Sequence, residues 1–372
     1  MCQSICEFCD LEMKNVRLSD VCSIRYGKDH KKLGSGNIPA YGSGGIMRYV
    51  DKAIHDRPSV LIPRKGSLNN LFFADEPFWT VDTLFWTEID DDKVLPKYLF
   101  YVLGRKNLSS LNEGTAVPSL TTKTLSDITI ALPSIEKQRE IIEKIEPLES
   151  KIKNNTQIND NLYEIVDAFY KKLFTAGDLK VTTIGQYMER IYSGGTPSTS
   201  NPSYWNGAYN WFSSGETKNP FVVSTEKTIT QVGIDNSSTK LANKYDVVIA
   251  SAGQGFTRGQ TSMLLLDTYI NQSVIVLHGA KNIMPYVFWN LRQRYDELRA
   301  ISDSSSIRGS LTTKTLSRLE IPEISDAEII EFSKTAWPAI NQIENNLNEN
   351  KQLIALRDLM LSRLFKAPPL LQ

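Results

Sequence analysis

The sequence predicts an α+β protein that arose by tandem duplication: two mixed α/β globular domains, separated by two long antiparallel helices that pair as a coiled coil. Two long segments have the apolar spacing of a coiled coil, and an eight-residue motif occurs at 119–126 and again at 310–317, 191 residues later. The predicted segments are 1–15 (N-terminal extension), 16–133 (first globular domain), 134–178 (central helical region), 179–322 (second globular domain), 323–367 (C-terminal helical region) and 368–372 (tail).

The first long helix is expected within residues 134–174, a glycine-free stretch rich in helix formers. Its candidate core positions are spaced alternately by three and four residues, as in the seam of a coiled coil. They are Ile145, Leu148, Ile152, Asn155, Asn159, Leu162, Val166, Phe169 and Leu173. So narrow a seam requires a partner helix.

The partner helix is expected in the same chain, at residues 325–365. The corresponding positions there are Ala336, Ala339, Ile343, Asn346, Asn350, Leu353, Arg357, Met360 and Leu364. Both copies carry two asparagines in the seam. A buried asparagine penalises every register that leaves its amide unpaired, so these layers are interpreted as fixing the register. The alternative is two independent amphipathic helices with these asparagines at the solvent edge.

Each predicted helical region contains one proline, Pro147 in the first and Pro338 in the second. Proline is tolerated in the first turn of a helix, where its missing N–H has no intrahelical partner. We therefore expect both prolines to begin the long helices, with a separate short helix before each.

The repeated motif is Ser-Leu-Thr-Thr-Lys-Thr-Leu-Ser, which we call the SLTTKTLS motif. Upstream of it the similarity is weaker: residues 96–103 resemble 285–292, and 59–63 resemble 246–250. A strand is expected at 59–62 and a helix at 96–104. The two halves share this frame, whereas the rest of the globular domains diverges, as expected if one scaffold presents two different recognition surfaces.

The composition excludes several classes of protein. The chain has 42 basic and 42 acidic residues, which argues against nucleic-acid binding by net charge alone. The absence of a long apolar run and of a signal peptide predicts a soluble, cytoplasmic protein without membrane contact.

The four cysteines lie at Cys2, Cys6, Cys9 and Cys22. The first three have the spacing with which radical enzymes hold an iron–sulfur cluster, but no run of alternating strands and helices follows. A mobile extension with reduced thiols is the preferred interpretation.

Sequence signals of catalysis are otherwise weak. Asn201–Tyr204 approaches the Asn-Pro-Pro-Tyr motif of adenine methyltransferases but lacks the second proline, and no glycine-rich cofactor loop is found in the expected place. The three histidines lack the spacing of metal ligands. We therefore predict a binding protein with no catalytic residues, no metal site and no cofactor of its own.

Three groups of residues form a pattern typical of one protein family: Ser193–Ser198 with Tyr204, Trp205 and Trp211, then Gly114–Leu120, and then Leu132–Ile142. Through them the chain resembles the DNA specificity subunits of type I restriction-modification systems, over about residues 14–366. It departs from the pattern twice: the first domain lacks the Gly-Gly-Thr-Pro opening of the second, and the second helix entry lacks the glutamine of the first.

The resemblance implies two target-recognition domains, each of which reads one half of an asymmetric site on double-stranded DNA. It further implies two modification subunits, which bind S-adenosylmethionine and methylate adenine, and restriction subunits that use ATP and Mg²⁺. The 28 residues from Pro147 to Phe174 would form a helix about 42 Å long, comparable with one turn of DNA. The helices are thus expected to set the gap between the half-sites and to dock the modification subunits.

The residues expected to contact DNA lie in polar or glycine-rich loops. Arginine and asparagine form paired hydrogen bonds with guanine and adenine, and lysine suits phosphate. The candidates are Tyr41, Arg48, Arg64, Lys65, Asn69 and Asn70 in the first domain, and Thr196, Gln254, Thr257, Arg258 and Arg308 in the second. A DNA-independent, two-lobed scaffold that binds proteins or glycans is the alternative from another class, and a methyltransferase is the alternative enzyme.

Overall fold

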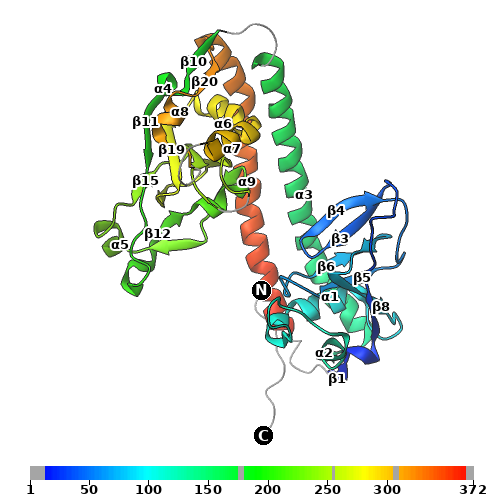
Figure 1. The fold of residues 1–372 in the computed structure, drawn as a ribbon. Helices are drawn as coiled ribbons and strands as arrows, with labels where there is room; N and C mark the ends of the chain where they lie inside the picture. The colour runs from blue at the N-terminus through cyan, green and yellow to red at the C-terminus, as the bar shows by residue number, and fades with distance from the viewer. Residues whose placement is uncertain (1–12, 175–179, 254–255, 305–309, 366–372) are drawn as a thin grey trace. The chain divides into compact units, whose positions relative to one another are not determined.

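The computed structural model describes residues 13–174, 180–253, 256–304 and 310–365 (Figure 1). The chain divides into two compact units: Met1–Lys151 with Leu353–Gln372, and Ile152–Gln352. The long helices α3 (Ile135–Phe174) and α9 (Asp326–Leu364) each contribute one segment to each unit. Every unit therefore contains one globular domain and a part of both helices.

The first unit is built on a four-stranded sheet with the order β2-β8-β5-β6, a three-stranded sheet β4-β3-β7 and the pair β1-β9. The predicted strand at 59–62 and helix at 96–104 are confirmed as β5 and α1. The elements are β1 (Lys14–Arg17), η2 (Leu18–Asp20), β2 (Cys22–Tyr26), β3 (Ile38–Gly42), β4 (Gly45–Val50), β5 (Ser59–Pro63), β6 (Phe72–Ala74), β7 (Trp79–Thr80), β8 (Leu84–Ile89), α1 (Pro96–Gly104), η3 (Leu108–Leu111), α2 (Thr122–Ser126) and β9 (Thr129–Leu132).

The core of the first unit lies between its main sheet and α1. All five residues of β5 are buried, as befits a strand covered on both faces. Ile141 and Ile145 of α3 belong to the same apolar cluster as Leu361 and Leu364 of α9. Cys22 is also buried there as a free thiol, and burial raises its pKa to about 12, so it is unreactive at neutral pH. Cys2, Cys6 and Cys9 lie outside the described residues.

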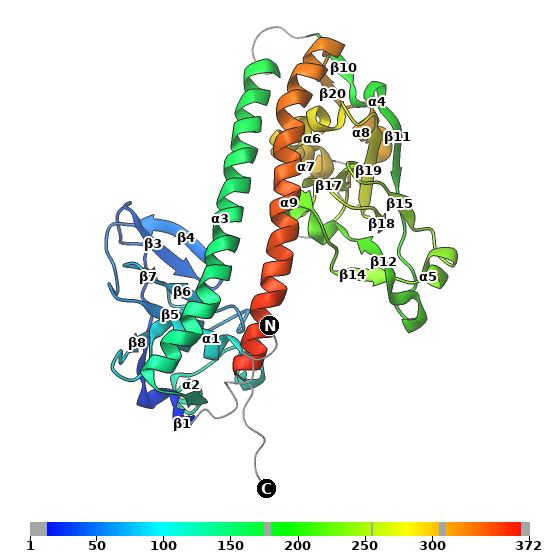
Figure 2. The ribbon, with the colours of Figure 1, turned by 180° about the vertical axis from the view of Figure 1, so that it is seen from behind.

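The second unit has a five-stranded sheet β11-β19-β16-β17-β13, a four-stranded sheet β14-β12-β18-β15 and the pair β10-β20 (Figure 2). Its elements, besides its parts of α3 and α9, are β10 (Val181–Thr183), α4 (Ile184–Tyr187), β11 (Met188–Ser193), η4 (Pro202–Tyr204), β12 (Trp205–Phe212), η5 (Ser214–Lys218), β13 (Phe221–Val222), β14 (Lys227–Ile229), α5 (Gln231–Asp235), β15 (Lys240–Ala242), β16 (Val247–Ala250), β17 (Thr261–Leu264), β18 (Thr268–Ile270), β19 (Val274–Gly279), α6 (Met284–Gln293), α7 (Tyr295–Ser304), α8 (Thr313–Ser317) and β20 (Glu320–Pro322).

The two units share one topology, which confirms the predicted duplication. The order β2-β8-β5-β6 corresponds to β11-β19-β16-β17, β4-β3-β7 corresponds to β14-β12-β18, and β1-β9 corresponds to β10-β20. Helices α1, α2 and α3 correspond to α6, α8 and α9 by their order in the chain. Strands β13 and β15 are additions at the edges of the second domain's sheets.

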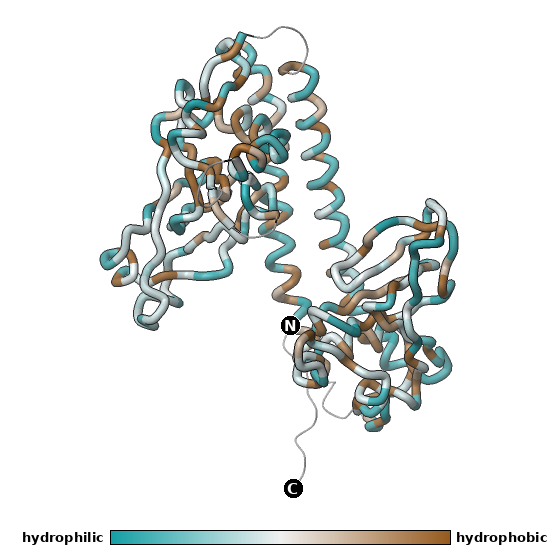
Figure 3. The backbone as a smooth tube through the Cα atoms, in the orientation of Figure 1, coloured by the Kyte–Doolittle hydropathy of each residue, from teal (hydrophilic) through white to brown (hydrophobic). Residues whose placement is uncertain are grey.

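The core of the second unit joins its domain to the helix pair. Trp289 of α6 stacks on Tyr163 of α3 with ring centroids 5.7 Å apart, and Phe332 of α9 stacks on Phe169 of α3 at 6.1 Å. These aromatic residues belong to or pack against one apolar cluster. Along both long helices, apolar and polar residues alternate, as Figure 3 shows. The helices therefore form part of the domain core.

Two layers of asparagine lie at the centre of the helix pair in the second unit. Asn155 Nδ2 donates to Asn350 Oδ1 at 2.9 Å, and Asn346 Nδ2 donates to Asn159 Oδ1 at 2.8 Å. All four side chains are at most 9% exposed, so they are not at the solvent edge. From the first layer to the second, the residue number rises from 155 to 159 on α3 and falls from 350 to 346 on α9. The two helices are therefore antiparallel.

The other predicted seam residues flank these layers. Ile343 is buried, whereas Ile152, Leu162, Phe169, Leu353 and Met360 are half-buried. Arg357, at a seam position in the first unit, is also half-buried and forms an ion pair with Asp358 at 2.8 Å.

The two asparagine layers are exchanged by the duplication. A shift of 191 residues converts Asn155 into Asn346 and Asn159 into Asn350. The pair Asn155–Asn350 thus becomes the pair Asn346–Asn159, and both pairs are hydrogen-bonded. The two layers are therefore related by a local pseudo-two-fold axis that passes between them.

The two prolines do not begin the long helices, and this prediction was wrong. Pro147 lies inside α3, which begins at Ile135, and Pro338 lies inside α9, which begins at Asp326. A proline inside a helix frees the carbonyl four residues earlier. Those residues, Glu143 and Lys334, are exposed, as are both prolines. Solvent can hydrate the freed carbonyls, so the helices continue.

Replacing Asn155 by leucine is expected to destabilise the chain by about 1–3 kcal/mol, because the buried Asn350 Oδ1 loses its donor. The double variant Asn155→Leu/Asn350→Leu should lose less, since neither amide of this layer is then left unpaired. Urea unfolding of the full-length chain measures both effects. A single variant with the same midpoint as the unmodified chain would show that the pair does not stabilise the helices.

Candidate functional site

Two loops occupy equivalent places in the two domains. We call residues 64–71, between β5 and β6, the first strand-end loop, and residues 251–260, between β16 and β17, the second strand-end loop. Each follows the buried strand that pairs with β8 or β19 in its sheet. Their sequences differ apart from the glycine at the third position, Gly66 or Gly253, although the strands before them correspond.

The SLTTKTLS motif holds both loops by the same hydrogen bond. The backbone N–H of Leu120 donates to Arg64 O at 3.0 Å, and that of Leu311 donates to Ser251 O at 3.0 Å. In the first domain, Gly66 N–H also donates to Pro118 O at 3.0 Å. Gly66 has φ +89°, a left-handed conformation that favours glycine. Identical supports therefore carry two different loops.

Each copy of the motif ends in a capped, anchored helical turn. Thr121 Oγ1 accepts a hydrogen bond from Thr124 N at 3.2 Å, and Thr312 Oγ1 accepts one from Thr315 N at 3.0 Å. The leucines of the turns are fully buried. The same contacts therefore hold the motif in place in both domains.

The candidates in the first strand-end loop differ in how freely they can meet a ligand. Arg64 Nη1 donates to Asp82 O at 3.2 Å, and its guanidinium lies 5.3 Å from the ring centroid of Tyr26. Lys65 is exposed and forms no ion pair with any described residue. Its ammonium is therefore available to an anion.

Both asparagines of this loop are fixed by neighbouring segments. Asn69 Oδ1 accepts from Ser109 N at 3.0 Å, and Asn70 Nδ2 donates to Ser43 O at 3.0 Å. The second contact ties the loop to the β3–β4 turn. Each amide keeps further donor or acceptor capacity for a ligand.

Tyr41 and Arg48 lie on the hairpin β3–β4. Tyr41 is half-buried with its ring centroid 6.0 Å from that of Phe72, and burial raises the pKa of its hydroxyl. The hydroxyl is therefore neutral and able to donate at physiological pH. Arg48 Nη2 donates to Leu33 O at 2.9 Å and Gly34 O at 3.1 Å, so this guanidinium also supports the chain itself.

The second-domain candidates are partly described. Gln254 and Arg308 lie outside the described residues. Arg258, with its side chain 20% exposed, forms an ion pair with Asp303 at 2.6 Å, and Thr257 is half-buried. The guanidinium of Arg258 is therefore already paired with a carboxylate of α7, and a ligand would have to compete with that ion pair.

Thr196 is brought to the second strand-end loop by the segment before β19. Its hydroxyl donates to the side chain of Gln272, and the next residue, Ser273, accepts through its carbonyl from Ser251 N at 2.9 Å. Thr196 and Ser251, 55 positions apart in the sequence, are thus linked through two adjacent residues.

Exposed cation–aromatic groups in the second domain were missed by sequence reasoning. Arg190 and Lys240 lie 5.6 and 5.9 Å from the ring centroid of Tyr192, and Lys227 lies 5.6 Å from that of Trp205. Aromatic rings beside cations suit nucleic-acid backbones and bases. Arg190 and Tyr192 lie two residues apart on β11, whereas Lys240 of β15 and Lys227 of β14 reach the rings from other strands, and no local sequence pattern indicates the contacts of these two lysines.

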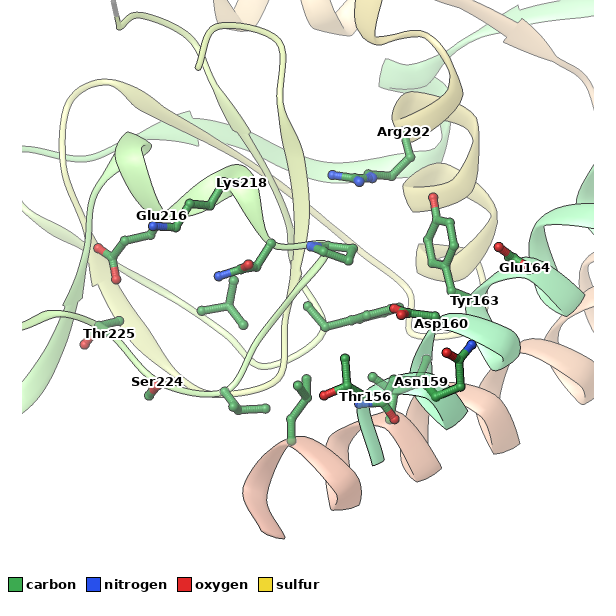
Figure 4. A pocket seen from close by; sticks show the side chains of 18 of the residues that line it. Thr156, Asn159, Asp160, Tyr163, Glu164, Glu216, Lys218, Ser224, Thr225 and Arg292 are labelled. Atoms are coloured by element: carbon green, nitrogen blue, oxygen red, sulfur yellow. The ribbon is translucent and has the colours of Figure 1, made fainter. Parts of the chain in front are cut away.

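A cavity of about 810 Å³ lies in the second unit between α3 and the segment 216–226 (Figure 4). Asp160 and Glu164 of α3 and Arg292 of α6 project toward it, and Tyr163 forms part of its wall. Its lining has four carboxylates, those of Asp160, Glu164, Glu216 and Glu226, and two bases, Lys218 and Arg292. Carboxylates outnumber bases in this lining, and their negative charge would repel a phosphate. We therefore leave the cavity out of the candidate DNA interface.

Two features of other protein classes are absent from the residues that the structure describes. No helix in the described part of the chain is both long and apolar enough to cross a membrane. The same residues contain no cluster of three or more histidine, cysteine or carboxylate side chains that could hold a metal ion.

Comparison with protein families identifies the class. The profile described as "Type I restriction modification DNA specificity domain" matches residues 11–164 and again residues 177–353. The chain belongs to this family and contains two tandem DNA-specificity domains. The resemblance expected from its sequence motifs is confirmed.

Individual relatives agree with this assignment. The chain is 23% identical to the type I restriction enzyme HindI specificity subunit of Haemophilus influenzae, with 81% of this chain and 84% of the relative covered. It is 26% identical to the EcoR124I/EcoR124II specificity subunit of Escherichia coli, with 74% and 73% covered. The crystal structure of the S subunit from M. genitalium matches with a TM-score of 0.64 at 14% identity, covering 96% of this chain and 97% of that one, and so shares the fold.

Proposed function

We propose that this chain is the DNA-recognition subunit of a type I restriction-modification complex, in which each globular domain reads one half of an asymmetric, two-part site. The observation that supports this most directly is the pair of strand-end loops. They are held by identical hydrogen bonds from Leu120 and Leu311, yet they carry different side chains. Two unlike readers on one scaffold suit two unlike half-sites.

The long helices are assigned two roles. Because each helix enters the core of both units, its length is tied to both domains and sets the gap between the half-sites. The helices also offer exposed surface for docking two modification subunits. Family membership favours this function over a DNA-independent scaffold.

Chemistry is assigned to the partner subunits. We place S-adenosylmethionine on the modification subunits, ATP and Mg²⁺ on the restriction subunits, and the whole complex in the cytoplasm, where genomic DNA is accessible. The two relatives from Haemophilus influenzae and Escherichia coli are both named specificity subunits, which supports this division.

Methyl transfer tests the proposal. The full-length chain and the modification subunit encoded in the same genome are assayed separately and together, with labelled S-adenosylmethionine and genomic DNA. We expect transfer to specific adenines only when both proteins are present. Methylation of the same adenines by the modification subunit without this chain would contradict the proposal, as would a mixture that neither binds nor methylates DNA.

A further inference from the structure

The SLTTKTLS motif is identical in both domains, but only one of its positions is exposed in both copies. That position is Lys123 in the first domain and Lys314 in the second. The other positions are at least half-buried in one copy or both. Most of them have structural roles described above: buried leucines, capping threonines and loop-holding backbone groups. Packing does not account for the lysine.

Ion pairing does not account for the lysine either. Neither Lys123 nor Lys314 forms an ion pair with any residue in the described ranges. Glu320, in the surface hollow beside Lys314, forms no ion pair with any described residue, and two other carboxylates that line these hollows pair with arginines. Asp127 contacts Arg17 at 3.4 Å, and Glu297 contacts Arg294 at 2.6 Å.

The hollow beside Lys123 contains one further carboxylate, that of Glu113. It accepts hydrogen bonds from the hydroxyls of Thr121 and Thr124. Both lysines therefore present an unpaired ammonium to solvent.

The surroundings of the two lysines have diverged. Four residues after Lys123 stands Asp127, whereas Arg318 stands four residues after Lys314, and the strand-end loops differ in every side chain that could meet a ligand. The lysine and the SLTTKTLS turn that carries it have stayed the same. A ligand that both domains share explains an exposed cation that both retain. The bases of an asymmetric site differ between its halves, but the sugar–phosphate backbone is the same in each.

We propose that Lys123 and Lys314 are equivalent contacts to backbone phosphates, one beside each half-site of the DNA. This inference rests on the proposed DNA-reading function and adds residues outside the strand-end loops. The motif places each lysine three residues after the leucine that holds its loop, Leu120 or Leu311, so the lysine is fixed relative to the reader. A phosphate contact fixes the orientation of the domain on DNA and carries no sequence information.

Salt dependence of binding tests the inference. The full-length chain, assembled with its modification subunits, is titrated with DNA that contains its methylation site and with DNA that lacks it, at several salt concentrations. Each of Lys123→Gln and Lys314→Gln should lower the slope of log K against log [salt] by about 0.9 and weaken binding about fivefold at physiological salt. The double variant should lose about 1.8 in slope, and the loss should be the same for both DNAs.

Lys334→Gln is the matched control. Lys334 is exposed, but its counterpart in the other repeat is Glu143, so the two repeats do not share a cation at this position. We therefore expect Lys334→Gln to leave the salt slope unchanged. Slopes unchanged by Lys123→Gln and Lys314→Gln, in a complex that still binds its site, would overturn the inference and leave the proposed function intact. Loss of modification subunits from the complex would also overturn it, and would assign the lysines to a protein contact. If the unmodified complex prefers no DNA sequence, the proposed function itself fails.

Discussion

Adding one helical turn to both α3 and α9 is expected to lengthen the gap between the two half-sites by about two base pairs. Four residues extend a helix by about 6 Å, and base pairs are spaced about 3.4 Å apart. The pseudo-two-fold axis indicates where to insert them. Duplicating residues 155–158 in α3 and 346–349 in α9 adds a third asparagine layer and preserves both existing pairs. Mapping methylated adenines in cells that express the variant measures the gap.

The control for this prediction duplicates only one of the two segments. The asparagines on one side of the insertion then face the wrong partners, so we expect a destabilised chain with little or no methylation. An unchanged gap in the double insertion, with methylation retained, would contradict the assignment of the helices as the ruler.

Reversing two charges in the first strand-end loop, Arg64→Glu with Lys65→Glu, is expected to weaken DNA binding on the order of 100-fold at physiological salt. Two lost phosphate contacts account for about 30-fold, and repulsion from the new carboxylates adds to it. Since Lys65 is exposed and unpaired in the described structure, we expect it to dominate the effect. Titration of the full-length chain with specific and unrelated DNA measures the loss, which should be uniform.

Lys171→Glu with Lys172→Glu changes the net charge equally, on an exposed part of α3, and should have a much smaller effect. Relaxed specificity at one half-site, without uniform weakening, would assign Arg64 and Lys65 to bases instead of phosphates. Unchanged binding would remove them from the interface.

The duplication and its frame could be predicted because they depend on local patterns. The SLTTKTLS motif, the seam spacing and the strand at 59–62 each appear as a contiguous or periodic signal. The prediction that the prolines begin the long helices failed because the sequence does not show that solvent reaches the carbonyls which these prolines free. With Glu143, Lys334 and both prolines exposed, the helices continue at little cost.

The two repeats differ at the helix entry, where Gln138 of the first corresponds to Ile329 of the second, and the structure explains this difference. Gln138 is fully buried, and it accepts from Leu95 N at 2.8 Å and donates to Lys93 O at 3.1 Å. Its counterpart, Ile329, belongs to the apolar cluster of the second unit. The glutamine satisfies backbone groups before α1, whereas the isoleucine packs against apolar neighbours. Sequence reasoning noted the lost glutamine but not its hydrogen bonds.

Contacts that depend on strand register could not be predicted. His278 has no ligand-like spacing in the sequence, yet its Nδ1 lies 2.6 Å from the Asp246 carboxylate. Strands β16 and β19 pair antiparallel, with Val247 opposite Leu277, and this register brings the two side chains together. The link of Thr196 to the second strand-end loop depends in the same way on contacts far apart in the sequence.

The most direct test of this account is the map of methylated adenines in a genome modified by this chain and its modification subunit, compared with the map after residues 180–322 are replaced by the second domain of another specificity subunit. We expect one asymmetric motif in two parts separated by a fixed gap of unread bases, and we expect the exchange to alter one part and leave the other part unchanged. A single uninterrupted motif, or an exchange that alters both parts, would contradict the claim that each domain reads its own half of the site.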